Sequence, residues 1–406
     1  TLFPYTTLFR SLFDSEIRER LLPLTFTRPV CELRIGILTI KEKWEKWMNA
    51  PAWYITQDYL AGKYPIEYDD ENYLINGAVL PSSQLCRLLE QMENGEAFLE
   101  GDELIAAKLE GEQMEQLIQD EDFGELKGFD LEDTKYLKIN HLWDIFKLNA
   151  PALRDDFELL TKGRQSQPIS ATNRCLGEEN IFLEEGAKVE CATLNATTGP
   201  IYVGKNAEIM EGSIVRGGLA MGEHSILKLG AKIYGATTLG PYCKLGGEVN
   251  NSILIGYSNK GHDGFLGNSV LGEWCNIGAD TNNSNLKNNY DQIKLWNYSK
   301  EGFVRTGEQF CGLFMGDHSK CGINTMFNTG TVVGVCANVF GSGFPRNFIP
   351  SFAWGGQSGF QTYKTDKAFE TVERVMARRN KTFDIEDRLI LLRIFEDSAK
   401  YRHWEK

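Results

Sequence analysis

Apolar residues recur at every sixth position over a long stretch of the chain, with polar residues and glycines between them. A fixed short period is typical of a stacked solenoid, and a period of six predicts a parallel β-helix with inward apolar side chains. A second run with the same spacing indicates that the β-helix continues beyond the first run. The positions in register are Val203, Ile209, Val215, Met221, Leu227, Ile233, Leu239 and Leu245, and then Met315, Cys321, Phe327, Val333 and Val339.

The pattern changes on both sides of this region. Glycine marks the change, since 28 of the 40 glycines lie between Gly177 and Gly343. Before it, short apolar runs such as 35–40 alternate with acidic amphipathic stretches, which predicts strands alternating with helices in an α/β domain. After it, apolar residues at helical spacing, with Asp384 at the start of the last helix, predict a helical tail.

These patterns divide the chain into five predicted segments. Residues 1–11 resemble translated linker sequence more than a signal peptide, so we expect a non-native leader. The predicted segments are the leader at 1–11, the α/β domain at 12–165, a polar linker at 166–172, the β-helix at 173–345 and the helical tail at 346–406.

Charge and cysteine content limit the classes of partner and the cellular location that we expect. A net charge of -13 argues against nucleic acid, which needs a basic surface, but is compatible with a local cationic pocket for small phosphorylated substrates. No apolar stretch is long enough to span a bilayer, so we expect no membrane partner. Nine cysteines without CxxC pairs favour reduced thiols and a cytoplasmic location.

The six-residue register lapses after Leu245 and resumes briefly at Leu271 and Ile277. The intervening segment carries His262 between two glycines. We expect a loop that leaves the solenoid here, and such loops are common places for functional sites.

The motifs around this histidine carry a resemblance to a known family. Residues 260–267 have the pattern K-G-H-x-x-F-L-G, and residues 276–281 have the pattern N-I-G-A-x-T. Both resemble the acetyltransferase half of the bacterial bifunctional glucosamine-1-phosphate acetyltransferase/N-acetylglucosamine-1-phosphate uridylyltransferase family. Residues 22–29 and 341–347 resemble an alternative bacterial branch of it. The resemblance implies a nucleotidyltransferase-like α/β domain, a left-handed β-helix, a homotrimer and active sites between neighbouring subunits.

The resemblance also implies roles for single residues. His262 matches the catalytic base that removes a proton from the acceptor amine, a task that neutral imidazole can perform near pH 7. A turn histidine that only caps backbone groups is the structural alternative. Asn276 would bind the sugar phosphate, and Ala279 would contact the acyl-CoA. Lys244 resembles a phosphate-binding arginine motif, and Lys260 would bind substrate beside the base.

Two departures from the family pattern concern the acceptor. Phe265 stands where the family has a tyrosine, and Asn250 and Asn251 lie where it has a lysine. The resemblance therefore does not define the acceptor sugar.

Further candidates have two interpretations each. The asparagines of 281–290 fit either sugar or pantetheine binding or tight turns, and we take Asn285 and Tyr290 as substrate-binding candidates. The basic side chains Arg378, Arg379 and Lys381 fit CoA phosphates, although a solvated helix face is favoured.

The first domain offers a weaker site. The Gly-rich G-x-G-T-R-M signature of the family's nucleotidyltransferase half is absent. Arg18 and Arg28 are candidates for gripping nucleotide phosphates and could equally be surface charges. Residues 76–77 lie roughly where the family has a metal-binding aspartate, so the metal ligands are unknown.

The sequence therefore predicts a transferase of nucleotide-sugar synthesis. The β-helix would transfer an acetyl group from acetyl-CoA to an aminosugar 1-phosphate. The first domain would couple a sugar 1-phosphate to a nucleoside triphosphate with Mg²⁺. The alternative is a uridylyl-, thymidylyl- or guanylyltransferase whose β-helix is only a trimerising or regulatory scaffold.

Overall fold

The computed structural model describes residues 9–120, 125–131 and 134–405, which form two compact units. Unit 1 holds most of the chain up to Asn140, and unit 2 holds everything from His141 onward. The early segments 19–27 and 34–37 also belong to unit 2. The domain boundaries predicted from the sequence stay predictions, because compactness does not define where a sequence domain ends.

Unit 1 is built on a mixed six-stranded sheet with the order β2-β1-β3-β5-β4-β6. β1 runs parallel to β2 and β3, whereas β5 is antiparallel to β3 and β4. Leu74, Leu109 and Met114 form part of its core, so α5 covers one face of the sheet. The strands are β1 (Phe9–Phe13), β2 (Trp53–Ile55), β3 (Glu71–Asn76), β4 (Glu96–Glu100), β5 (Glu103–Glu110) and β6 (Lys127–Asp130). The helices are α2 (Ile40–Met48), α3 (Asp58–Ala61), α4 (Ser83–Glu90), α5 (Gly111–Asp120) and the 3₁₀ turn η1 (Val30–Glu32); α1 (Ile17–Arg20) is shared between the units.

Local sequence signals explain several of these ends. Thr39 begins α2 with a capping box, accepting from the Glu42 N–H while the Glu42 carboxylate accepts from the Thr39 N–H. The apolar run 35–40 therefore forms no strand, contrary to our expectation, because its last residue already starts this helix. β1 includes Phe9 to Ser11, three residues of the predicted leader. Residues 1–8 lie outside the described residues, and the leader stays a prediction.

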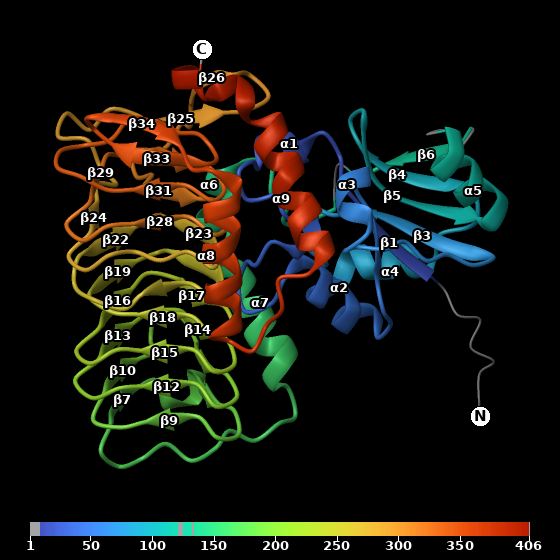
Figure 1. Cartoon of the computed structure of the whole chain (residues 1–406). Helices are drawn as coiled ribbons and strands as arrows, with labels where there is room; N and C mark the ends of the chain where they lie inside the picture. The colour runs from blue at the N-terminus through green and yellow to red at the C-terminus, as the bar shows by residue number, and fades with distance from the viewer. Residues whose placement is uncertain (1–8, 121–124, 132–133, 406) are drawn as a thin grey trace. The chain divides into compact units, whose positions relative to one another are not determined.

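Unit 2 is dominated by a β-helix with three stacked faces (Figure 1). All strand pairs that stack coil on coil are parallel, for example β12 with β15 and β15 with β18. Face 1 contains β7 (Arg174–Leu176), β10 (Thr193–Asn195), β13 (Ile214–Arg216), β16 (Lys232–Tyr234), β19 (Glu248–Asn250) and β22 (Phe265–Gly267). Face 2 contains β8 (Ile181–Leu183), β11 (Ile201–Val203), β14 (Leu219–Met221), β17 (Thr237–Leu239), β20 (Ile253–Gly256), β23 (Val270–Glu273), β27 (Leu313–Met315), β30 (Thr331–Val333) and β32 (Phe348–Ile349). Face 3 contains β9 (Lys188–Val189), β12 (Glu208–Ile209), β15 (Ile226–Leu227), β18 (Lys244–Leu245) and β21 (Asn259–Lys260), and then β28 (Lys320–Cys321), β31 (Asn338–Val339), β33 (Ala353–Gly356) and β34 (Gly359–Thr362).

The six-residue register is the reason for this shape. Ile209, Leu227 and Leu245 stack on one another on face 3, and each follows the previous one after 18 residues, which is three periods of six. Every position of both predicted runs is buried in one continuous apolar core. The predicted fold class is confirmed, and the three-faced coil is consistent with a left-handed parallel β-helix.

The lapse in the register is not a loop that leaves the solenoid, and this expectation is wrong. Lys260 pairs with Leu245 on face 3, and Ile277 lies one coil further on. The coil from Leu245 to Lys260 has 15 residues instead of 18, so the spacing changes while the strand pairing continues. A true excursion follows later, with β24 (Asn282–Asn283) and β29 (Met326–Phe327) on either side of the hairpin of β25 (Lys294–Asn297) and β26 (Gly302–Arg305).

Helices complete unit 2. They are α6 (Leu142–Lys147), α7 (Asn149–Thr161), α8 (Thr365–Ala377) and α9 (Ile385–Asp397), with the 3₁₀ turns η2 (Glu178–Asn180), η3 (Ala399–Tyr401) and η4 (His403–Glu405). Figure 1 shows α8 running along the stack across several coils. Asp384 caps α9 by accepting from the Asp387 N–H, as the sequence predicts. In the described part of the chain, no helix has the length and apolar character needed to cross a membrane. All nine cysteines are free thiols.

Candidate functional site

Outward side chains on face 3 form a column over four successive coils. Lys244 pairs with Asn259, which forms a bridge to Asn276, which in turn forms a bridge to Lys320. The residue that follows each of them in the sequence points into the core, as Leu245 does after Lys244. The β-helix thus repeats one outward position and fills it with polar, hydrogen-bonding side chains.

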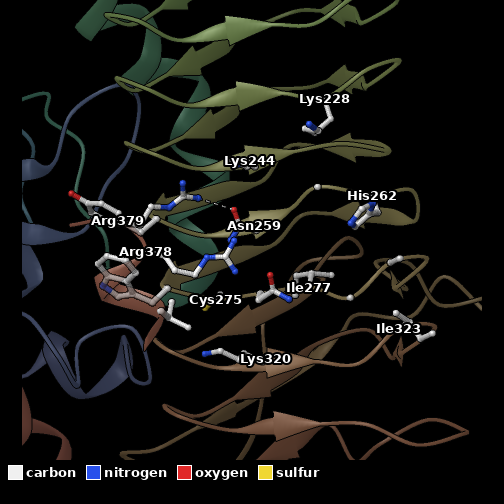
Figure 2. A pocket seen from close by; sticks show the side chains of 17 residues that line it. Lys228, Lys244, Asn259, His262, Cys275, Ile277, Lys320, Ile323, Arg378 and Arg379 are labelled. Carbon is white, nitrogen blue, oxygen red and sulfur yellow. Dashed lines mark hydrogen bonds between the residues drawn. The ribbon is translucent and has the colours of Figure 1, made fainter. Parts of the chain in front are cut away.

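This column borders a cavity of about 750 Å³ (Figure 2). His262, Asn276, Ala279 and Lys244 all line it, so the structure brings four of the predicted site residues together. In Figure 2, His262 lies on the opposite side of the view from Arg379, with Lys320 below them. The other lining residues are Lys228, Tyr257, Asn259, Gly261, Trp274, Cys275, Ile277, Gly278, Lys320, Ile323, Val375, Arg378 and Arg379.

The cavity is strongly cationic. Five basic side chains line it, and none of the ion pairs within the described residues involves any of them. They are Lys228, Lys244, Lys320, Arg378 and Arg379. Burial lowers the pKa of Lys244, and the like charges of Arg379, Lys228 and Arg378 lower it further. Burial also lowers the pKa of Lys320. Uncompensated cations in a concave site favour an anionic ligand.

α8 brings two of these cations to the cavity. Arg379, just after the helix, donates to the Asn259 side-chain oxygen at 3.4 Å, and Arg378 and Val375 also line the cavity. Arg378 is exposed and Arg379 is half-buried, so both interpretations of these side chains, a solvated helix face and CoA-phosphate binding, stay predictions. Helical spacing shows only that a residue lies on a polar face, and the tertiary fold decides what that face meets. The third basic residue, Lys381, lies over the ring of Tyr257 at 5.9 Å.

His262 occupies the corner where the chain leaves face 3. The residue is exposed, and its imidazole makes no hydrogen bond to the described residues. Gly264 follows with a φ of 112°, and a Cβ there would collide with the Thr281 carbonyl oxygen, so only glycine fits this tight corner. The ring is thus available to a ligand at the edge of the cavity.

A ladder of stacked rings forms the neighbouring corner of the β-helix. The ring centroids of Tyr257 and Trp274 lie 4.2 Å apart, Tyr242 covers the other face of Tyr257, and His318 stacks on Trp274. Tyr257 and Trp274 therefore stack on ring neighbours along the ladder, and both also line the cavity. His318 belongs to the same corner, with a φ of 60°.

Ala279 contributes backbone groups to the cavity wall. It lines the cavity, its carbonyl accepts from the Asn324 N–H at 2.8 Å, and its own N–H donates to none of the described residues. An unused N–H at a cavity wall can stabilise an oxyanion.

Three predicted residues of the β-helix lie away from the cavity. Lys260 is only 1% exposed and points into the core of the solenoid. Asn285 donates to the Asn268 side-chain oxygen at 2.8 Å, and Tyr290 is 64% exposed; neither lines the cavity. Their predicted substrate contacts stay predictions.

Sequence reasoning missed Lys228 and Lys320. Lys320 could have been found, because it directly precedes Cys321 in the register, as Lys244 precedes Leu245 and Asn276 precedes Ile277. Lys228 directly follows Leu227 and faces the cavity from a corner, for which the register carries no signal.

In unit 1, Arg18 and Arg28 are both buried, at 7% and 4% exposure, so neither is a surface charge. Arg18 donates to the Tyr59 hydroxyl at 2.5 Å and lies 3.6 Å from the Asp14 carboxylate. Asp14 also accepts from the Val30 N–H at 2.8 Å, and burial raises the pKa of its carboxyl. These contacts join the end of β1 to the segment that follows it.

Asn76 ends β3 with a structural role. It is fully buried, and its amide donates to Glu103 and to the Leu104 carbonyl at 3.0 and 3.2 Å. Across the described residues, no three His, Cys, Asp or Glu side chains gather to hold a metal ion. The predicted Mg²⁺ requirement and its ligands stay predictions.

Residues 11–165 match the family model described as sugar nucleotidyl transferase. The match covers less than half of the chain and includes five whole strands of the unit 1 sheet and the last three residues of β1. It agrees with the nucleotidyltransferase-like α/β domain predicted from the sequence. A search of curated protein sequences found no match.

Three solved structures with some similarity to the chain are described as acyltransferases or acetyltransferases. A UDP-N-acetylglucosamine acyltransferase from Bacteroides fragilis is 12% identical, with a TM-score of 0.30, over 51% of this chain and 77% of that one. An Arabidopsis UDP-N-acetylglucosamine acyltransferase is 13% identical, with a TM-score of 0.26, over 52% and 77%. A polySia-specific acetyltransferase is 13% identical, with a TM-score of 0.27, over 52% and 94%. Similarity this distant does not define an activity.

Proposed function

We propose that the β-helix transfers an acetyl group from acetyl-CoA to the amine of an aminosugar 1-phosphate, with His262 as general base. The observation that carries this proposal is a single cavity bordered by an exposed imidazole and by five uncompensated cations. The resemblance of the motifs around His262 to an acetyltransferase family supports the same chemistry.

The proposed reaction is a single acyl transfer. The acceptor amine attacks the thioester carbonyl carbon, so a carbon–nitrogen bond forms and the carbon–sulfur bond breaks. His262 takes the proton that the amine must lose, and the thiolate of CoA leaves and is protonated to the free thiol. The Ala279 N–H would stabilise the negative charge that develops on the carbonyl oxygen.

Charge explains how both substrates would be held. CoA and a sugar phosphate are anions, and no acidic side chain is among the described residues that line the cavity. Arg378, Arg379 and Lys244 would bind phosphate groups, and Asn276 would bind the sugar phosphate near His262. A volume of about 750 Å³ suits ligands of this size.

The test is release of CoA from acetyl-CoA in the presence of a panel of aminosugar phosphates. His262→Ala should lower kcat by about 100-fold or more, the usual scale for a lost general base. His224→Ala is the matched control, because His224 is an exposed corner histidine of the same β-helix that does not line the cavity. Equal rates for both variants would exclude His262 as the base.

We also propose that residues 11–165 couple a sugar 1-phosphate to a nucleoside triphosphate with Mg²⁺, as in the bifunctional family that the sequence resembles. The match to the sugar nucleotidyl transferase family model supports this activity. Arg18 and Arg28 would contribute positive charge near the phosphates. Mg²⁺-dependent pyrophosphate release is the readout, and its absence with every nucleoside triphosphate would refute this half of the proposal.

The alternative keeps only nucleotidyl transfer and makes the β-helix a trimerising or regulatory scaffold. It predicts pyrophosphate release without any CoA release. The five cations favour the acyltransferase, because a purely structural face does not need uncompensated positive charge in a cavity. A homotrimer and a cytoplasmic location remain part of the proposal.

A further inference from the structure

One coil of the β-helix core contains a lysine where its neighbours have apolar residues. On face 3, Leu227 and Leu245 occupy the inward position of two successive coils, and Lys260 occupies it in the next coil. The two coils that follow have Ile277 and Cys321 at this position. Lys260 is 1% exposed and is among the largest fully buried side chains of the described residues. Burying an ammonium group is unfavourable unless hydrogen bonds compensate for the lost water.

The ammonium group has specific partners. Its Nζ donates to the Gly246 carbonyl at 3.0 Å and to the His262 carbonyl at 2.9 Å. The first acceptor belongs to the previous coil, and the second belongs to the corner that carries the candidate base. Lys260 therefore ties the corner to the coil beneath it.

The neighbouring carbonyls show why this contact matters for His262. The Asp263 carbonyl accepts from the Asp280 N–H at 2.9 Å, and the Gly264 carbonyl accepts from the Glu248 N–H at 3.3 Å. The His262 carbonyl accepts from no backbone N–H within the described residues, and Lys260 is its donor. The backbone that carries the imidazole is thus held by a side chain.

We propose that Lys260 is a positioning residue that fixes the main chain of His262 and so holds its imidazole at the edge of the cavity. This inference rests on the proposed acyl transfer and replaces the substrate contact expected from the sequence. Burial lowers the pKa of Lys260 to about 8, so at pH 7 the ammonium is still largely charged. Charged donors make shorter and stronger hydrogen bonds than neutral ones.

Lys260→Met tests the proposal, because methionine fills the inward position without donating a hydrogen bond. Leu245→Met is the matched control in the same inward position one coil earlier, because leucine has no side-chain donor to lose. Hydrogen–deuterium exchange should become faster at residues 261–264 in Lys260→Met and stay unchanged there in Leu245→Met. For acetyl transfer, kcat should fall by on the order of 100-fold in Lys260→Met with little change in the KM for acetyl-CoA, since misplacement of a reacting group by about 1 Å has effects of that size.

The two readouts separate this inference from the proposed function. Unchanged exchange at residues 261–264 in Lys260→Met overturns the positioning role, whether or not the protein transfers acetyl groups. Faster exchange with unchanged kcat overturns its importance for catalysis. If the wild-type protein transfers no acetyl group to any acceptor, the proposed function fails, and the exchange measurement still decides whether Lys260 holds the His262 backbone.

Discussion

The ammonium group of Lys260 is poorly solvated, and this has a measurable consequence at the scale of one residue. Burial is the main cause that lowers its pKa from the ordinary 10.5 to about 8. The native protein therefore holds this proton less tightly than the unfolded chain does. Between these two pKa values the unfolded chain binds more protons, so the free energy of unfolding rises with pH across this window.

We expect this dependence to disappear in Lys260→Met. From pH 7 to pH 10.5 the wild-type protein should gain stability relative to the variant by on the order of 3 kcal/mol, because each pKa unit corresponds to about 1.4 kcal/mol. Denaturant unfolding of both proteins at several pH values measures the difference. If the difference in free energy of unfolding between the two proteins stays constant from pH 7 to pH 10.5, Lys260 is not a buried lysine with a lowered pKa.

At the scale of the element, the side of the strand on which an apolar side chain lies determines whether it stabilises the fold. Ile214 in β13 and Ile233 in β16 belong to adjacent strands of face 1. Ile214 points outward and is 52% exposed, whereas Ile233 points inward and is 2% exposed. Side chains alternate between the two sides of a strand, so a shift of one residue decides between core and surface.

Truncation of these two isoleucines should therefore have different effects. Ile233→Ala should lower the free energy of unfolding by about 2–5 kcal/mol, through lost burial and the cavity that remains. Ile214→Ala should stay within about 0.5 kcal/mol, as is usual for surface substitutions. Chemical denaturation of the two variants beside the wild-type protein checks this. Similar losses in both would mean that Ile214 is covered in solution.

At the scale of the whole molecule, the chain joins a nucleotidyltransferase-like unit to a β-helix in one polypeptide. A stack of coils leaves broad outer faces, and closed symmetric association is the common way in which such faces are covered. The family that the sequence resembles is trimeric, with active sites between neighbouring subunits. We therefore expect three chains in the working molecule.

Sedimentation equilibrium tests this expectation. The mass should be three times the 45.9 kDa of the chain and independent of concentration over the micromolar range. Ile214→Ala and His262→Ala should sediment as the wild-type protein does. A single species of 45.9 kDa would exclude the trimer and, with it, a site shared between subunits.

The sequence by itself determined the β-helix and the neighbourhood of His262. A period of six can be recognised without any structure, because each coil repeats the same local geometry and each inward position needs an apolar side chain. The outward neighbours of that register, such as Lys244 and Asn276, follow from the same repeat. Asp384 could be recognised as a helix start because a cap is a local feature.

Only the tertiary structure decided which distant residues meet. Arg378 and Arg379 are more than a hundred residues from Asn259 along the chain, and nothing in the spacing of a helix indicates which coil it packs against. Lys260 falls outside the six-residue register because its coil is three residues shorter than the two coils before it. Its strand nevertheless pairs with that of Leu245, and this pairing places Lys260 in the inward position. Long-range packing and hydrogen bonding decide where the two arginines and Lys260 lie. Such long-range contacts leave no periodic signal in the sequence.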